Sequence, residues 1–68
     1  MIDMDQLIAK IDESGLKRRY IAENLGMSES LLSKKLAKEA EFKGSEIAKL
    51  ANILRLSDDE RVSIFMPK

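Results

Sequence analysis

The sequence contains neither cysteine nor histidine, and these two absences remove several classes of function. Without cysteine there are no disulfide bonds, and without either residue there is no zinc finger. Histidine-based acid–base catalysis is excluded as well. We therefore expect no metal ion and no cofactor. The stability of a 68-residue chain must then come from one small, tightly packed core.

Several other features are scarce. One proline, three glycines and few β-branched residues favour helices over strands. One tyrosine and two phenylalanines are too few for a surface that stacks the bases of single strands. No apolar run is long enough for a signal peptide or a membrane span, so we expect a cytoplasmic location and no membrane contact. Residues 1–68 are predicted to form a single all-α domain.

The charges cancel over the whole chain but are unevenly distributed. Residues 1–15 sum to −3 and residues 39–68 sum to −1. The 17–38 segment, with six basic and two acidic residues, carries +4. A basic middle between acidic ends can present one positive face to a partner, although charge alone does not separate this from ordinary solvated helix surfaces.

Apolar residues recur at helical spacing in five stretches, each with a start or stop signal. Helix starts are expected at Asp3, with Gln6 as its capping-box partner, near Lys17, after Ser28, at Lys43 or Ser45, and after Ser57, with Glu60 as its partner. The expected stops are Gly15, Gly26 and Pro67. The predicted buried residues are Met4, Leu7, Ile8, Ile11, Ile21, Ala22, Leu25, Leu32, Leu36, Phe42, Ile47, Leu50, Ala51, Leu54, Val62 and Phe65.

The segment from Leu16 to Leu36, LKRRYIAENLGMSESLLSKKL, makes a functional statement possible. Ala22 is small enough for a helix crossing, Gly26 suits a tight turn, and two leucines follow as apolar anchors. This spacing is typical of a helix-turn-helix, whose second helix enters the major groove of DNA.

These residues also resemble a known family. RRYIAENLGMSESLLSKKL is similar to the helix-turn-helix of phage Cro and repressor proteins, EFKGSEIAKLANILRLSDDE resembles the helix that follows it, and VSIF resembles their C-terminal end. The use of Leu36 as the last apolar anchor resembles small prophage-encoded Cro-like regulators of Gram-positive bacteria. The resemblance implies a five-helix, Cro-like DNA-binding domain whose helices 2 and 3 form the helix-turn-helix.

The family reads bases from the exposed side of the third helix. By resemblance, the base-reading residues here are Ser28, Glu29, Ser30, Ser33 and Lys34. Lysine can donate to guanine, and serine can pair with several bases. Glu29 has two open interpretations: it accepts a hydrogen bond from cytosine, or it supports the start of the helix through the macrodipole.

The family also holds phosphates at the start of the second helix and in the loop before the fourth. The corresponding residues are Arg18, Lys43 and Gly44. Lys17 stands where the family usually has a capping Ser or Thr, which suggests a phosphate contact in place of a cap. Arg19, Lys35 and Lys38 complete the predicted phosphate contacts, with solvated surface as the alternative for the last two.

We expect the protein to act as a weak homodimer on double-stranded operator DNA, excluding polymerase or a rival repressor. One helix reads few base pairs, so specificity requires two half-sites about one helical turn, ~34 Å, apart. If Val62 and Phe65 face inward, Ile64 points outward. Ile64 and Met66 are therefore the predicted dimer contact.

Two alternatives use the same scaffold. The chain could be a protein-interaction module, such as an antitoxin or the target of an antirepressor, because fold and function are separable. It could also be the N-terminal DNA-binding domain of a longer repressor, although Met1 and the final IFMPK lead us to expect natural termini. An enzyme is not expected, because no nucleophile–base pair, phosphate-binding glycine loop or metal-ligand cluster can be assembled, and we expect no small-molecule substrate.

Overall fold

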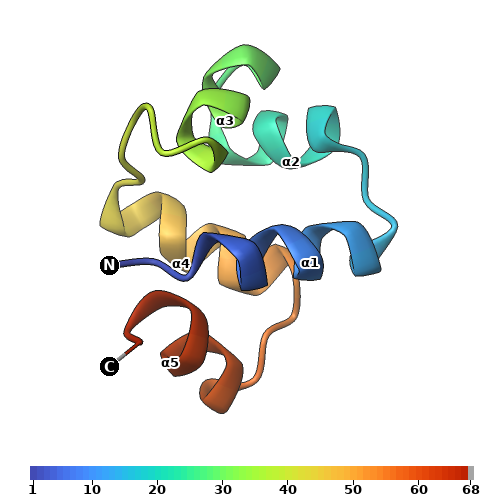
Figure 1. Ribbon diagram of the computed structural model, residues 1–68. Helices are drawn as coiled ribbons and strands as arrows, with labels where there is room; N and C mark the ends of the chain where they lie inside the picture. The colour runs from blue at the N-terminus through green and yellow to red at the C-terminus, as the bar shows by residue number, and fades with distance from the viewer. Residues whose placement is uncertain (68) are drawn as a thin grey trace.

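The computed structural model describes residues 1–67, and within these residues the protein is all-α with five helices. They are α1 (Met4–Ser14), α2 (Arg18–Leu25), α3 (Glu29–Leu36), α4 (Gly44–Ile53) and α5 (Asp58–Phe65). In Figure 1, α2 and α3 form one end of the molecule, α1 and α4 the middle, and α5 the opposite end. None of the helices in the described part of the chain has the length and apolarity needed to cross a membrane.

The helix starts agree closely with the sequence. The side chains of Asp3, Ser28 and Ser57 each accept a hydrogen bond from an amide in the first turn of the following helix. Ser57 and Glu60 form the predicted reciprocal capping box. The predicted capping box at α1 was wrong in one respect, because the Gln6 side chain does not accept a hydrogen bond from the Asp3 amide. That amide donates to the carbonyl of Ile64 at 2.7 Å, and the Gln6 side chain donates to Ser63 at 2.9 Å.

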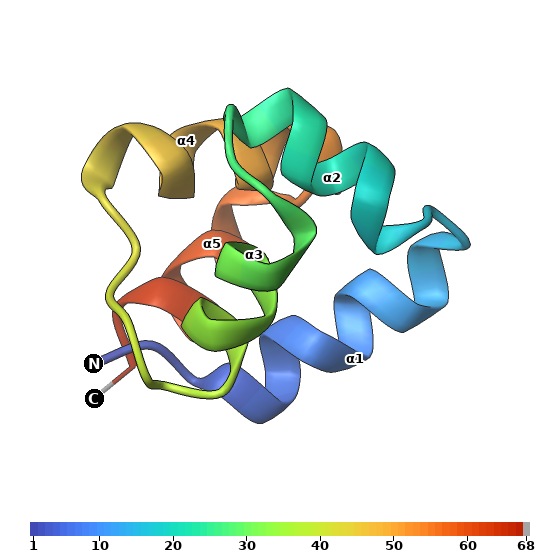
Figure 2. The same ribbon diagram turned by 90° about the horizontal axis from the view of Figure 1, so that it is seen from above.

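The predicted stops at glycine are confirmed. Gly15 and Gly26 have φ angles of 73° and 72°, in the left-handed region that glycine enters without a steric penalty. The turn between α2 and α3 is consequently short, and it places the two helices against each other (Figure 2).

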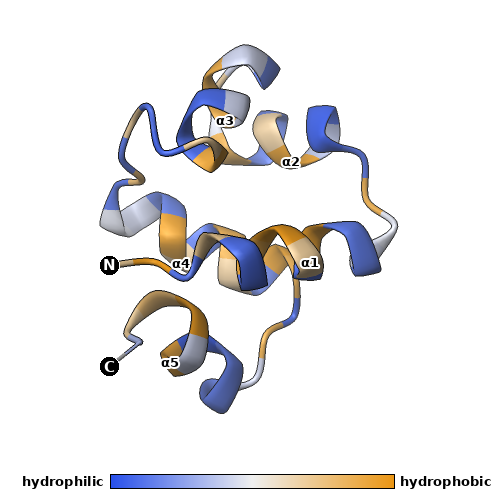
Figure 3. Ribbon diagram, viewed as in Figure 1, coloured by the Kyte–Doolittle hydropathy of each residue, from blue (hydrophilic) through white to orange (hydrophobic). Residues whose placement is uncertain are grey.

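The core follows the predicted apolar stripes. Leu7, Ile21, Leu32, Leu50 and Ile64 are completely buried, and every helix contributes to the interior. Figure 3 shows the hydrophobic segments facing one another across the helices, while the outer surface of α3 is mostly hydrophilic. Phe42 packs partly buried against the core, as expected.

The prediction for α5 was wrong for Val62 and Ile64, although Phe65 packs partly buried against the core as expected. Ile64 is 0% exposed and belongs to the core, whereas Val62, predicted to be buried, is 51% exposed. The reason is the register of α5 on α1, which is fixed by the hydrogen bond to the Ile64 carbonyl and by an ion pair between Lys10 and Glu60. A helix held through residues 60 and 64, four apart, turns residue 62 towards solvent.

Candidate nucleic-acid interface

The outer face of α3 is exposed and polar. The five residues predicted to read bases are all exposed: Ser28, Glu29, Ser30, Ser33 and Lys34. α3 lies with α2 at one end of the molecule, and α4 lies nearer the middle (Figure 1). An α-helix presented in this way can enter a groove as wide as the major groove of B-DNA, ~12 Å.

The start of α3 is organised by Ser28. Its hydroxyl oxygen accepts a hydrogen bond from the amide of Leu31 at 3.1 Å, which fixes the first turn of the helix. The hydroxyl proton is not used in that bond and remains able to donate to a ligand. Glu29 is the first residue of α3 and is exposed, a position compatible with both interpretations of its role.

The starts of α2 and α4 differ from those of the other three helices. Each follows a lysine, Lys17 or Lys43, and in neither case does that side chain accept a hydrogen bond from the first turn. Lysine has no acceptor to offer, so the first amides of α2 stay available to an anion. At α4 the amides of Lys43 and Glu46 already donate to the Glu46 carboxylate and the Lys43 carbonyl, which leaves those of Gly44 and Ser45. In Figures 1 and 2 these two helix starts lie on opposite sides of α3. The exposed helix α3 is therefore flanked by two helix starts that each carry a lysine and amides able to donate to an anion.

Most of the predicted phosphate contacts are accessible. Lys17, Arg19, Lys38, Lys43 and Gly44 are exposed, and Arg18 is half-buried. Arg19 pairs with Glu23 at 3.4 Å, but both side chains are largely exposed, and such surface pairs are weak enough to exchange for a phosphate.

The prediction that Lys35 lies on the surface, in contact with phosphate or solvent, was wrong. Its side chain is 6% exposed, and its Nζ atom lies 2.5 Å from Oε1 of Glu46 on α4 and 5.8 Å from the ring centroid of Phe42. The charge of Lys35 is thus neutralised inside the protein and is not available to phosphate. Without it, the 17–38 segment retains five basic and two acidic residues, a net +3.

Glu46 is the residue that sequence reasoning missed. Its Oε1 atom also accepts a hydrogen bond from the amide of Lys43 at 2.9 Å, so one carboxylate holds both α3 and the start of α4. The bond from Lys35, and then the amide bond, lower the pKa of Glu46 below its ordinary value of 4.5. A signal for the inward position of Lys35 did exist, since it follows the buried Leu32 by three residues and shares its helix face.

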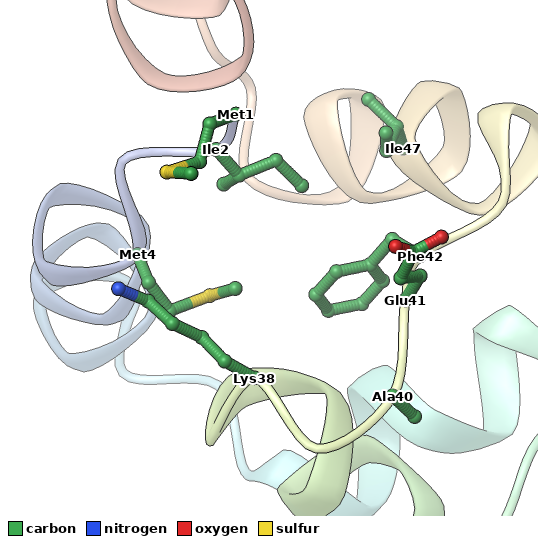
Figure 4. Close-up of a pocket in the computed structure, with 8 residues that line it drawn as sticks. All are labelled: Met1, Ile2, Met4, Lys38, Ala40, Glu41, Phe42 and Ile47. Atoms are coloured by element: carbon green, nitrogen blue, oxygen red, sulfur yellow. The ribbon is translucent and has the colours of Figure 1, made fainter.

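Lys38 lies at the edge of a hollow of about 470 Å³ between the N-terminal segment and the loop before α4. Figure 4 shows its side chain running towards Met4, with Phe42 across the hollow. The backbone of Lys38 has a φ of 65°, a left-handed conformation that is unfavourable for a residue with a side chain. Lys38 is exposed and lies two residues after the last residue of α3.

The predicted dimer contact is only partly accessible. Ile64 is buried in the monomer and cannot contact a second copy, which overturns that half of the prediction. Met66 is 64% exposed and remains on the surface.

Comparison with known proteins gives no match: no family model, no curated protein and no solved structure matches this chain.

Proposed function

We propose that this protein binds double-stranded DNA sequence-specifically through α3, as a Cro-like helix-turn-helix regulator that occupies operator DNA. The observation that supports this most strongly is the exposed polar face of α3 between the starts of α2 and α4, each of which follows an exposed lysine. Phosphates of the two DNA strands flank the major groove, so a helix in the groove needs anion-binding groups on both sides.

In this arrangement the two sets of residues have separate tasks. The helix starts and their cations hold the backbone, which fixes the position of α3 without selecting a sequence. The side chains of Ser30, Ser33 and Lys34 then meet the edges of the bases, with Ser28 and Glu29 at the beginning of the helix.

Two copies are required for a specific site. The longest extent of the molecule is 29 Å, which is shorter than the ~34 Å between half-sites one helical turn apart. A single copy therefore reads one half-site, and we propose a weak dimer that DNA stabilises by holding two copies side by side. Bound in this way, the dimer would exclude polymerase or a rival repressor from the operator.

The deciding experiment selects bound sequences from random duplex DNA and then measures affinity for the selected duplex at several salt concentrations. We expect a palindromic sequence and an affinity that falls with salt. The log–log slope should amount to about −0.9 for each phosphate neutralised, hence several units in total. A slope near zero, or equal affinity for selected and random duplexes, would overturn the proposal and leave the protein-interaction alternative.

A further inference from the structure

One large apolar side chain lies on the otherwise polar outer face of α3. Leu31 is 38% exposed, whereas Leu32 and Leu36 on the same helix are 0% and 4% exposed and form part of the core. The other exposed positions of α3 and its cap carry hydroxyl, carboxylate, ammonium or methyl groups. The monomer thus leaves more than a third of the Leu31 surface uncovered.

The position of Leu31 places it beside the residues proposed to read bases. It lies one helical turn after Ser28 and one turn before Lys34, so the three side chains are neighbours along one edge of the reading face. Helical side chains lean towards the N-terminus of their helix. Leu31 therefore leans towards the first turn of α3, where its own amide is tied to the Ser28 hydroxyl at 3.1 Å.

We propose that Leu31 contacts the C5-methyl group of a thymine and so sets a preference for thymine at one position of each half-site. This inference rests on the proposed function. Leucine has no donor or acceptor, and the thymine methyl is the apolar group that the standard bases present in the major groove. Burying one methyl group between apolar partners is expected to raise affinity about three- to fivefold.

The test replaces the thymines of the selected duplex with deoxyuridine, one at a time. This substitution removes the methyl group and leaves every hydrogen-bonding group of the base in place. For the parent protein, we expect one position per half-site at which affinity falls about three- to fivefold. For Leu31→Ala, that position should lose its sensitivity, and selection from random DNA should no longer favour thymine there.

The matched control is Val62→Ala, because Val62 is also an exposed apolar residue but lies on α5. This variant should retain the deoxyuridine sensitivity of the parent. Leu31→Gln provides a second variant with good helix propensity, and circular dichroism establishes that each variant is folded.

The possible failures can be told apart. A folded Leu31→Ala or Leu31→Gln that keeps the full sensitivity of the parent at every thymine overturns the role of Leu31 while leaving DNA binding intact. The role of Leu31 is also overturned if the parent protein binds its selected duplex and no deoxyuridine substitution lowers its affinity. A parent that selects no sequence at all refutes the proposed function itself.

Discussion

At the scale of single residues, two cations occupy backbone positions that favour glycine. Lys38 follows the end of α3 with a φ of 65°, and Arg55 follows the end of α4 with a φ of 53°. The corresponding positions after α1 and α2 are Gly15 and Gly26. A left-handed conformation costs a residue with a Cβ atom about 1 kcal/mol. Lys38 and Arg55 therefore each make the folded protein less stable than glycine would at the same position.

This comparison gives a prediction about Lys38. Replacing it with glycine should raise the free energy of unfolding by about 0.5–1 kcal/mol, because glycine adopts the left-handed conformation without strain but loses more chain entropy on folding. The same change should weaken binding to all duplexes, since a proposed phosphate contact is lost. Arg55→Gly is the control: urea unfolding should show a similar gain in stability, whereas DNA affinity stays unchanged. Equal affinities of the parent and Lys38→Gly would show that Lys38 does not contact DNA.

Lys34 and Arg18 should fail in different ways when each is replaced with alanine. Lys34 is exposed on the face of α3 that we propose reads bases, so its loss should cost about 1–3 kcal/mol of binding and relax the preference at one base pair. Arg18 begins α2, so its loss should weaken all sequences alike and make the salt slope about one unit shallower. Titrations of the selected duplex and of single base-pair variants separate these patterns. If Lys34→Ala preserves the ranking of sequences, its role in base reading is wrong.

At the scale of elements, a single carboxylate on α4 joins this helix to α3. Glu46 on α4 binds Lys35 of α3 and the amide of Lys43, so it fixes the position of α3 relative to the proposed phosphate site at the start of α4.

Helix boundaries could be predicted from the sequence because caps and left-handed stops act locally, as at Ser28 and Gly26. The partner of Lys35 could not, because it lies eleven residues away on another helix and depends on tertiary packing.

The lowered pKa of Glu46 makes the α3–α4 connection sensitive to acid. A carboxyl whose pKa is lower in the folded protein stabilises it fully above about 4.5, and this stabilisation is lost as the pH falls towards the folded pKa. Glu46→Gln should therefore reduce stability at pH 7 by about 1–3 kcal/mol, because Lys35 loses its charged partner. Between pH 7 and pH 3.5 it should then lose less stability than the parent, as measured by urea unfolding.

Glu60 provides a comparison on a different pair of helices. Its hydrogen bond from Lys10, followed by one from the Ser57 amide, lowers its pKa to about 2. Glu60→Gln should also reduce the acid dependence of stability, but without affecting α3. DNA affinity should therefore decrease for Glu46→Gln alone. An acid dependence of Glu46→Gln equal to that of the parent would exclude the proposed role of this carboxylate.

At the scale of the whole molecule, the segment that begins α1 is held against the end of α5. The amide of Asp3 donates to the carbonyl of Ile64, and the Gln6 side chain donates to the Ser63 hydroxyl. The sequence predicted that α5 exists but not which side faces the core. Three apolar residues on an eight-residue helix permit more than one orientation, and contacts with α1 decide between them.

The buried position of Ile64 predicts a loss of stability where the sequence alone suggested a loss of dimerisation. Ile64→Ala should lower the free energy of unfolding by about 2–5 kcal/mol, because it removes a completely buried side chain and leaves a cavity between α5 and α1. Val62→Ala on the same helix is the control, and it should change stability by less than about 0.5 kcal/mol because Val62 is half exposed. Thermal and urea unfolding of both variants, at several protein concentrations, distinguish a core residue from an interface residue. Ile64→Ala could instead be as stable as the parent at low protein concentration and bind DNA less cooperatively. That result would show that Ile64 is a dimer contact, and it would contradict the packing of α5 described above.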